Sequence, residues 1–149
     1  MNLFVDPGAV THGIQLAVAP VFVLTAVSGM IGAVAARLSR IIDRARVLEE
    51  RMQPDTAAEL VARARLELAT LRTRGLLANS TIGMLTVCAF LIGLTIILLF
   101  LGETTVFQID RLAIGSFLAG IVCFMLALVC FMAETLIATR ILNFGKSFH

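Results

Sequence analysis

The sequence predicts an all-α integral membrane protein: three transmembrane helices, with a cytoplasmic antiparallel helical hairpin between the first two. Hydrophobic residues make up 59% of its 149 residues and charged residues only 15%, and the mean hydropathy is +0.98. Three stretches, 8–36, 75–102 and 112–133, carry no charged residue. Soluble domains contain about 25% charged residues. The composition therefore excludes an ordinary soluble domain.

Each uncharged stretch is long enough to cross a bilayer, because a hydrocarbon core of about 30 Å needs about 20 apolar residues in an α-helix. We place the spans near 14–36, 75–101 and 112–133, within one membrane domain covering 1–149. The first span is not expected to be a cleaved signal peptide. No Lys or Arg precedes it, and its apolar run is longer than the usual range of about 7–15 residues.

The distribution of Lys and Arg predicts the orientation, because short segments rich in these residues stay in the cytoplasm. Residues 1–13 have none, and residues 37–74 have nine of the twelve. The loop 103–111 has one, and the tail after the third span has two. We therefore expect a multi-pass protein with its N-terminus outside and with the hairpin and the C-terminus in the cytoplasm.

Residues 37–74 are expected to form the two arms of the hairpin. A break is predicted at Gln53-Pro54-Asp55, because proline lacks a backbone donor and clashes with the preceding turn. Apolar residues recur every three or four positions in both arms, which is the spacing of a coiled coil. They are Leu38, Ile41, Ala45, Leu48 and Met52 in the first arm and Ala57, Val61, Ala64, Leu68 and Leu71 in the second.

The hairpin's arginines have more than one interpretation. Nine arginines are interleaved with six acidic residues between 37 and 74, which leaves a net charge of +3. They can serve only to set the topology and keep the helices soluble. Alternatively, they contact anionic lipid headgroups or a cytoplasmic protein partner. The interleaved acids argue against nucleic-acid binding, which needs a strongly basic surface.

The first span sorts by residue size when it is drawn as a helix with 100° per residue. Small residues fall on one side and bulky residues on the other: Thr25, Ser28, Gly29, Gly32 and Ala36 against Val23, Val27, Met30 and Val34. If the helix continues, Asp43, Arg46 and Glu50 extend the small side. Small residues spaced by four let helices approach closely in lipid. We expect the bulky side to pack within the subunit and the small side to face another copy or water.

Two residues near the start of the first span have open interpretations. Pro20 frees a carbonyl near Leu16 and is expected either to be a tolerated kink or to act as a hinge or gate. Gln15 is a polar group inside the membrane and needs a partner there.

The third span carries a matching stripe of small residues that ends on a charge. Its members are Ser116, Gly120, Cys123, Ala127, Cys130 and Glu134, with Leu118, Ile121, Met125, Leu128 and Met132 on the opposite side. Glu134 should therefore point into the bundle, near Arg37 and Arg40 at the cytoplasmic interface. We expect an ion pair there, and the alternative is a charge that lines an ion path. The second span is less regular, with Asn79, Gly83, Thr86 and Gly93 at helical spacing.

The residues that usually carry catalysis or bind metals are not grouped in this sequence. Cys88, Cys123 and Cys130 all lie inside predicted spans and are interpreted as packing residues. The two histidines, His12 and His149, lie near opposite ends of the chain. No phosphate-binding glycine loop, nucleophile motif or zinc spacing is present. We therefore expect no enzyme activity, no cofactor and no metal.

The stretch from Ile14 to Glu50 resembles a family of small bacterial membrane proteins catalogued as domain of unknown function 2721. The resembling features are Ala19-Pro20, Arg37-Leu38 and the run from Arg40 to Arg46, and the resemblance continues over most of residues 12–140. It implies a membrane fold and a bacterial, cytoplasmic-membrane origin. It implies no activity.

Three functions remain open. The first is a homo-oligomeric ion pore, with Gln15, Thr25, Ser28, Gly32 and Ala36 at the pore or helix interface and Asp43, Arg46 and Glu50 around a cytoplasmic vestibule. The second is a non-conducting scaffold or adaptor that docks a cytoplasmic partner through its hairpin. The third is an accessory subunit, or an enzyme, whose chemistry lies in another protein. Membrane lipids and further copies of the chain are the expected partners.

Overall fold

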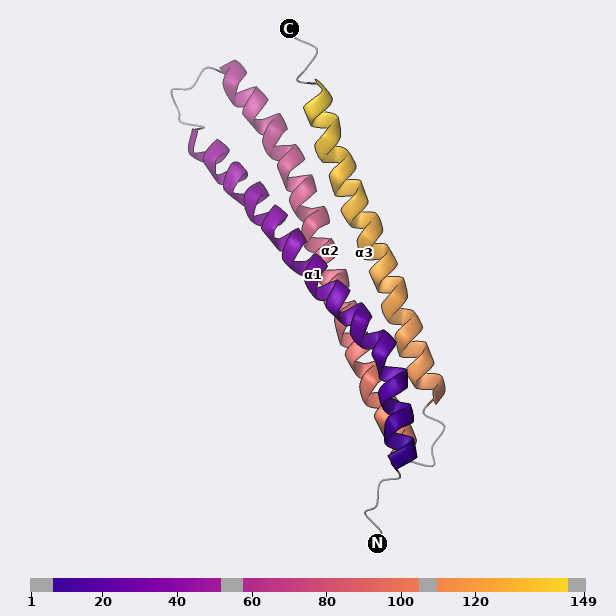
Figure 1. Cartoon of the computed structure of the whole chain (residues 1–149). Helices are drawn as coiled ribbons and strands as arrows, with labels where there is room; N and C mark the ends of the chain where they lie inside the picture. The colour runs from indigo at the N-terminus through magenta and orange to yellow at the C-terminus, as the bar shows by residue number, and fades with distance from the viewer. Residues whose placement is uncertain (1–6, 52–57, 105–109, 145–149) are drawn as a thin grey trace. The chain divides into compact units, whose positions relative to one another are not determined.

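The computed structural model describes residues 7–51, 58–104 and 110–144, and these form three helices (Figure 1). They are α1 (Pro7–Arg51), α2 (Ala58–Thr104) and α3 (Asp110–Phe144). The all-helical prediction is confirmed for the described residues. The predicted break at Gln53-Pro54-Asp55 lies outside them, as do the stripe residues Met52 and Ala57.

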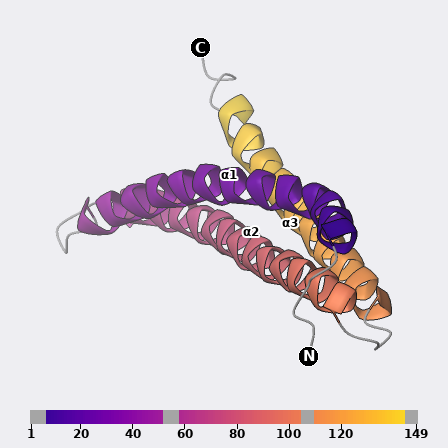
Figure 2. The ribbon, with the colours of Figure 1, turned by 60° about the horizontal axis from the view of Figure 1, so that its bottom comes forward.

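Each helix is long and apolar enough to cross a membrane, so the chain has the three membrane-spanning segments that its composition predicts. The helices contain 45, 47 and 35 residues, more than a bilayer requires. α1 and α2 continue without interruption from their apolar stretches into the Arg-rich segment (Figure 2). The two arms expected between 37 and 74 are therefore the ends of the long helices α1 and α2, and not a separate pair of helices.

The contacts divide the chain into two compact units, each with parts of α1, α2 and α3. The first unit comprises Met1–Ile31 and Met84–Met125. Its buried apolar side chains include Val27, Leu85 and Ile92. A hydrogen bond of 2.8 Å between the hydroxyl oxygens of Thr95 and Ser116 also links α2 to α3 in this unit.

The second unit comprises Gly32–Gly83 and Leu126–His149. In its Arg-rich part, Ile41, Leu48 and Leu71 form a buried cluster between α1 and α2. Ala45, Ala64 and Leu68 pack against that cluster. All six belong to the apolar stripes seen in the sequence. These stripes bring the ends of the two long helices together.

The small residues of α3 point inward, as their spacing in the sequence predicts. Gly120 and Ala127 are buried, whereas Leu118, Met125 and Met132 are exposed. A Cβ atom added at Gly120 would lie 3.0 Å from Cδ1 of Ile92 and 3.5 Å from Cβ of Leu91. The absence of a side chain at Gly120 therefore lets α3 approach α2 closely.

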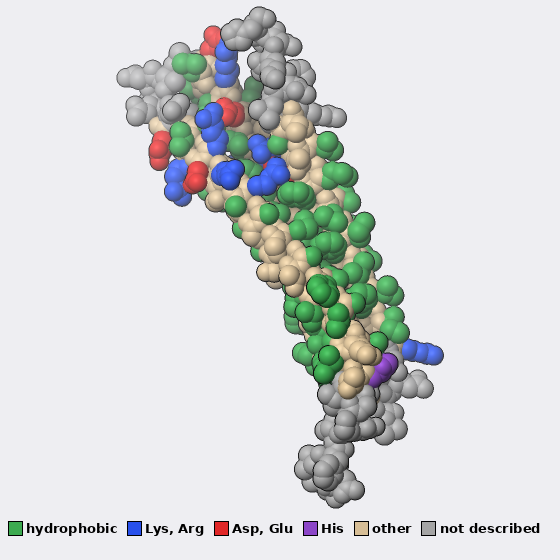
Figure 3. All heavy atoms as spheres, viewed as in Figure 1, with side chains coloured by type: hydrophobic (Ala, Val, Ile, Leu, Met, Phe, Trp, Pro, Cys, Tyr) green, Lys and Arg blue, Asp and Glu red, His purple; other side chains and the backbone are tan. Residues whose placement is uncertain are grey.

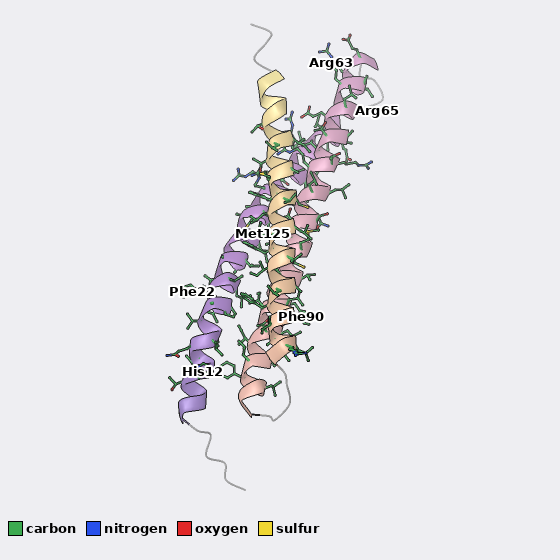
Figure 4. The ribbon with its side chains drawn as sticks, turned by 90° about the vertical axis from the view of Figure 1, so that its right-hand side faces the viewer. His12, Phe22, Arg63, Arg65, Phe90 and Met125 are labelled. Atoms are coloured by element: carbon green, nitrogen blue, oxygen red, sulfur yellow. The ribbon has the colours of Figure 1, made fainter. Side chains whose placement is uncertain are left out.

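The bulky side of α1 also points inward, because Val27 and Val34 are almost completely buried. Each helix leaves large apolar side chains on its outer side, as expected for surfaces that meet lipid tails. Phe22 on α1, Phe90 on α2 and Met125 on α3 are examples (Figure 4).

Candidate functional site

The first candidate site is formed by three charges that mark the ends of the three uncharged stretches. Arg37 directly follows the stretch 8–36, Arg74 directly precedes 75–102, and Glu134 directly follows 112–133. One lies on each helix, and all three belong to the second unit. The structure brings them into direct contact.

Glu134 is the buried centre of this cluster, with a side chain only 2% exposed. Its Oε2 lies 2.7 Å from Nη2 of Arg37. Its Oε1 lies 2.9 Å from Nη2 of Arg74 and accepts a hydrogen bond of 3.0 Å from Nε of the same guanidinium. A buried carboxylate is tolerated only when it is paired and hydrogen-bonded, and these two arginines satisfy both oxygens.

Arg37 is held by further contacts on α3. Its Nη1 donates a hydrogen bond of 3.3 Å to Oγ1 of Thr135, which in turn donates to the carbonyl oxygen of Phe131 at 2.9 Å. Its guanidinium also lies over the Phe131 ring, 5.0 Å from the centroid, within cation–π range. Arg37 therefore ties α1 to α3 through three residues of α3.

A cleft of about 440 Å³ lies beside the cluster, within the second unit. It is lined by Arg37, Arg40 and Arg44 of α1, Arg74 of α2, and the apolar side chains of Ile41 and Leu71. We call it the four-arginine cleft. Figure 3 shows basic and acidic side chains gathered over this part of α1 and α2, whereas apolar side chains predominate over the rest of the described residues on this face.

The arginines of the cleft differ in how they are neutralised. Arg44 pairs with Glu67, at 2.9 Å from Nη2 and 3.0 Å from Nε to Oε1. Arg37 and Arg74 share Glu134. Arg40 takes part in none of the ion pairs found among the described residues. Four guanidinium groups thus face two carboxylates, which leaves a formal charge of +2.

The second candidate site is the small side of α1, which the structure leaves exposed. Five residues between positions 25 and 36 lie on this side, and all are exposed: Thr25, Ser28, Gly29, Gly32 and Ala36. A Cβ atom added at Gly29 or Gly32 would meet no atom within 4 Å. Asp43, Arg46 and Glu50 continue this side and are also exposed. We call the five residues from Thr25 to Ala36 the small face of α1.

The structure places the other residues singled out in the sequence as follows. Gln15 is exposed on α1, and Pro20 is buried within a helix that continues through it. Arg37 and Glu134 meet, whereas Arg40 lines the cleft and Arg74 provides the second partner of Glu134. Arg74 was not expected in this role. Its position at the edge of an uncharged stretch was the signal that would have indicated it.

Two buried hydroxyls also lie outside the sequence-based expectations. Thr81 donates to the carbonyl oxygen of Leu77 at 2.9 Å, and Thr95 donates to that of Leu91 at 2.8 Å. Every buried side-chain polar atom of the described residues has a hydrogen-bond partner. In the same part of the chain, no three His, Cys, Asp or Glu side chains lie close enough together to hold a metal ion.

The three apolar helices and their inward-facing ionic cluster define a multi-pass membrane protein. The chain belongs to the family described as Protein of unknown function (DUF2721), whose model matches residues 17–144. The resemblance noted in the sequence is thereby confirmed, and the match includes α1 from Ala17 onward, the cleft and Glu134. No curated protein and no solved structure matches the chain.

Proposed function

We propose that the protein is a homo-oligomer of the bacterial cytoplasmic membrane whose subunits meet along the small face of α1, and that this side of α1 lines an ion-conducting path. The excess of arginine between 37 and 74 orients the chain with the N-terminus outside and the Arg-rich ends of α1 and α2 in the cytoplasm. The carrying observation is the exposure of the small face on a subunit that buries the opposite side of the same helix.

Exposed small residues are an unusual surface to offer to lipid. Helices in membranes associate through small residues, because their backbones then approach closely and gain van der Waals contact. Ser28, Gly32 and Ala36 are spaced by four residues and lie on one line of α1. Gly32 has no neighbour within 4 Å of an added Cβ, so its small size has no use within the subunit. In the proposed oligomer, a second copy of the chain packs against Gly32, and the small size of this residue allows the close approach.

The same side of α1 changes character along the helix, which supports a path with distinct zones. Val18, Val21 and Phe22 are exposed on this side before Thr25 is reached. A path lined by α1 is therefore apolar and narrow at its outer end, where pores can close by losing water. Beyond the small face, Asp43, Arg46 and Glu50 place charges of both signs around a cytoplasmic vestibule.

Cysteine cross-linking in the membrane tests the assembly. The three native cysteines, Cys88, Cys123 and Cys130, are first replaced by alanine. Gly32→Cys is then expected to form disulfide-linked dimers on mild oxidation, because two copies meet there. Val122→Cys is the matched control, since Val122 is exposed on α3 and outside the small face. Equal cross-linking at both positions would contradict an interface at the small face.

Recordings from the purified protein in planar bilayers test conduction. We expect discrete current steps from the wild type, and smaller or absent steps from Ser28→Leu, because leucine replaces a small polar side chain on the path. Val122→Leu serves as the control and should conduct as the wild type does. An assembled oligomer without current, and without an open axis, would remove the pore from the proposal and leave the assembly.

A non-conducting scaffold is the second candidate, and one observation favours it. Leu60 and Leu66 lie in the Arg-rich part of α2, yet their side chains are 58% and 72% exposed. A cytoplasmic protein bound to this part of α2 would cover the apolar surface of these two side chains. The double variant Leu60→Glu/Leu66→Glu would then lose a co-purifying cytoplasmic partner. An unchanged set of co-purifying proteins would count against this candidate.

A further inference from the structure

The four-arginine cleft lies at the level where the apolar parts of the helices end. Arg37 is the first charged residue after the uncharged stretch of α1, and Arg74 is the last before the uncharged stretch of α2. Both arginines line the cleft. An uncharged stretch of this length fills the hydrocarbon core, so the residues directly at its end reach the headgroup layer. The cleft therefore opens at the depth of the lipid phosphates.

The net positive charge of the cleft favours the binding of an anion. Its four guanidinium groups are matched by only two carboxylates, those of Glu134 and Glu67. Arg40 takes part in no ion pair among the described residues, although it lines the same cleft. The planar fork of a guanidinium matches two oxygens of a phosphate, which makes arginine the usual residue for phosphate recognition. A phosphate bound beside Arg40 and Arg44 supplies the missing negative charge.

The lining of the cleft is partly apolar, which favours a phospholipid over a free phosphate ion as the ligand. Ile41 and Leu71 are buried side chains that belong to the cluster joining α1 to α2, and both face the cleft. A volume of about 440 Å³ is much larger than a phosphate alone requires. The remaining space suits the glycerol carbons that connect a lipid phosphate to its acyl chains.

We propose that the four-arginine cleft binds the phosphate of an anionic phospholipid. The guanidinium groups of Arg40 and Arg44 hold the phosphate oxygens, and Ile41 and Leu71 contact the glycerol carbons. The cluster around Glu134 holds Arg37 and Arg74 in place and so shapes the wall of the cleft. This inference depends neither on assembly nor on conduction, because every residue involved belongs to one subunit. A soluble phosphate ester offers the same oxygens, and the experiment separates the two sources.

Native mass spectrometry of the full chain, released from a non-ionic detergent, measures the binding directly. The protein is titrated with phosphatidylglycerol and, separately, with the zwitterionic phosphatidylcholine. We expect phosphatidylglycerol to bind more tightly. Arg40→Gln should weaken that binding about fivefold, the effect expected for one arginine near an anionic lipid surface. Because Arg40 is exposed and outside the ion pairs found, this variant should fold as the wild type does.

Two matched variants separate specific binding from general charge. Arg65→Gln removes the same charge from an exposed position of α2 outside the cleft and should leave lipid binding unchanged. Glu67→Gln breaks the pair with Arg44 but keeps every arginine, so it should tighten binding, whereas Arg44→Gln should weaken it. If Arg44 only supports the fold through Glu67, these two variants will instead change binding in the same direction, and the assignment of Arg44 fails.

Competition identifies the source of the phosphate. Inorganic phosphate and glycerol 3-phosphate should not displace phosphatidylglycerol, because they lack the acyl chains that hold the lipid beside the cleft. Displacement by either one, in proportion to its concentration, would make this a site for a soluble anion and overturn the lipid assignment. Equal binding of the two phospholipids, or equal losses in Arg40→Gln and Arg65→Gln, would overturn the site itself.

Discussion

α1 and α3 both carry a stripe of small residues at helical spacing, but the two stripes face opposite ways. On α3 the stripe is turned inward, and Gly120 and Ala127 are buried against the rest of the subunit. On α1 the bulky side is turned inward, and Ser28, Gly32 and the rest of the small face are exposed. The residue types are alike, so composition alone does not determine which stripe packs within the subunit.

The difference shows that small residues have two separate uses in a membrane helix. At Gly120 the missing side chain allows a close approach, since an added Cβ would lie 3.0 Å from Ile92. At Gly32 an added Cβ would meet nothing within 4 Å. The first glycine has its packing partner inside the subunit, and the second has a partner only if another molecule supplies one. Substitutions at these two positions should therefore affect different properties of the protein.

The largest loss of unfolding free energy is expected from a substitution at Glu134, where the inward-facing stripe of α3 ends. Glu134→Ala leaves the guanidinium groups of Arg37 and Arg74 without their shared carboxylate. Removing one member of a buried pair costs about 3–5 kcal/mol of unfolding free energy. We expect a value near the lower limit, because Arg37 and Arg74 are 32% and 21% exposed and retain some water. Unfolding in SDS, followed by far-UV circular dichroism, measures the loss.

The control for this prediction is the pair between Arg44 and Glu67, whose side chains are 55% and 44% exposed. Exposed ion pairs contribute about 0–1 kcal/mol, so Glu67→Ala should lower the unfolding free energy by less than about 1 kcal/mol. If Glu134→Ala proves as mild as Glu67→Ala, the inward end of the α3 stripe is not what holds the second unit together.

An intermediate effect is expected from Gly120→Leu. The new side chain meets Ile92, which is completely buried. Overpacking a filled core costs about 1–3 kcal/mol, so the same unfolding measurement should show a loss in that range. The oligomeric state of the variant that stays folded should not change, because Gly120 faces the interior of its own subunit. A loss of assembly without a loss of stability would reverse the roles given to the two stripes.

The opposite result is expected from Gly32→Leu. The subunit has open space around Gly32, so its unfolding free energy should stay within about 0.5 kcal/mol of the wild type. The oligomer should dissociate about tenfold more readily, which corresponds to about 1.4 kcal/mol of association free energy. Light scattering on the detergent-solubilised protein measures the assembly. Gly32→Ala, which keeps the residue small, should assemble as the wild type does, and an intact oligomer of Gly32→Leu would count against the proposed interface.

Much of the fold follows from the sequence, because a bilayer imposes a simple length requirement. The uncharged stretches predict three membrane-spanning helices, and the structure contains them. The sorting of α1 by residue size also predicts which side is buried, since Val27 and Val34 are covered. Both inferences use periodicity along a single helix, and neither requires knowing how one helix is rotated relative to another.

The contacts of the candidate site cannot be predicted without knowing how the helices are rotated relative to one another. The spacing places Glu134 near the arginines that end the first span, but it does not distinguish Arg37 from Arg40. These residues lie one turn apart, and the depth and rotation of α3 decide which of them reaches the carboxylate. Arg74 belongs to a different helix, so no single-helix pattern indicates it. The contact between Thr95 and Ser116 depends on the same rotations.

The smallest loss of unfolding free energy is expected at the contact between Thr95 and Ser116. A matched substitution on α1 again compares the two stripes of small residues. Thr95→Val removes the 2.8 Å hydrogen bond to Ser116 within the buried side of α2 and α3. Interhelical hydrogen bonds in membranes contribute about 0.6 kcal/mol, so the unfolding free energy should fall by about that amount. Thr25→Val is the matched control, because Thr25 is exposed on the small face of α1 and donates only to the carbonyl oxygen of Val21, 3.1 Å away in its own helix. Thr25→Val should therefore leave the subunit's stability unchanged, and a loss equal to that of Thr95→Val would mean that the small face of α1 already packs within the subunit.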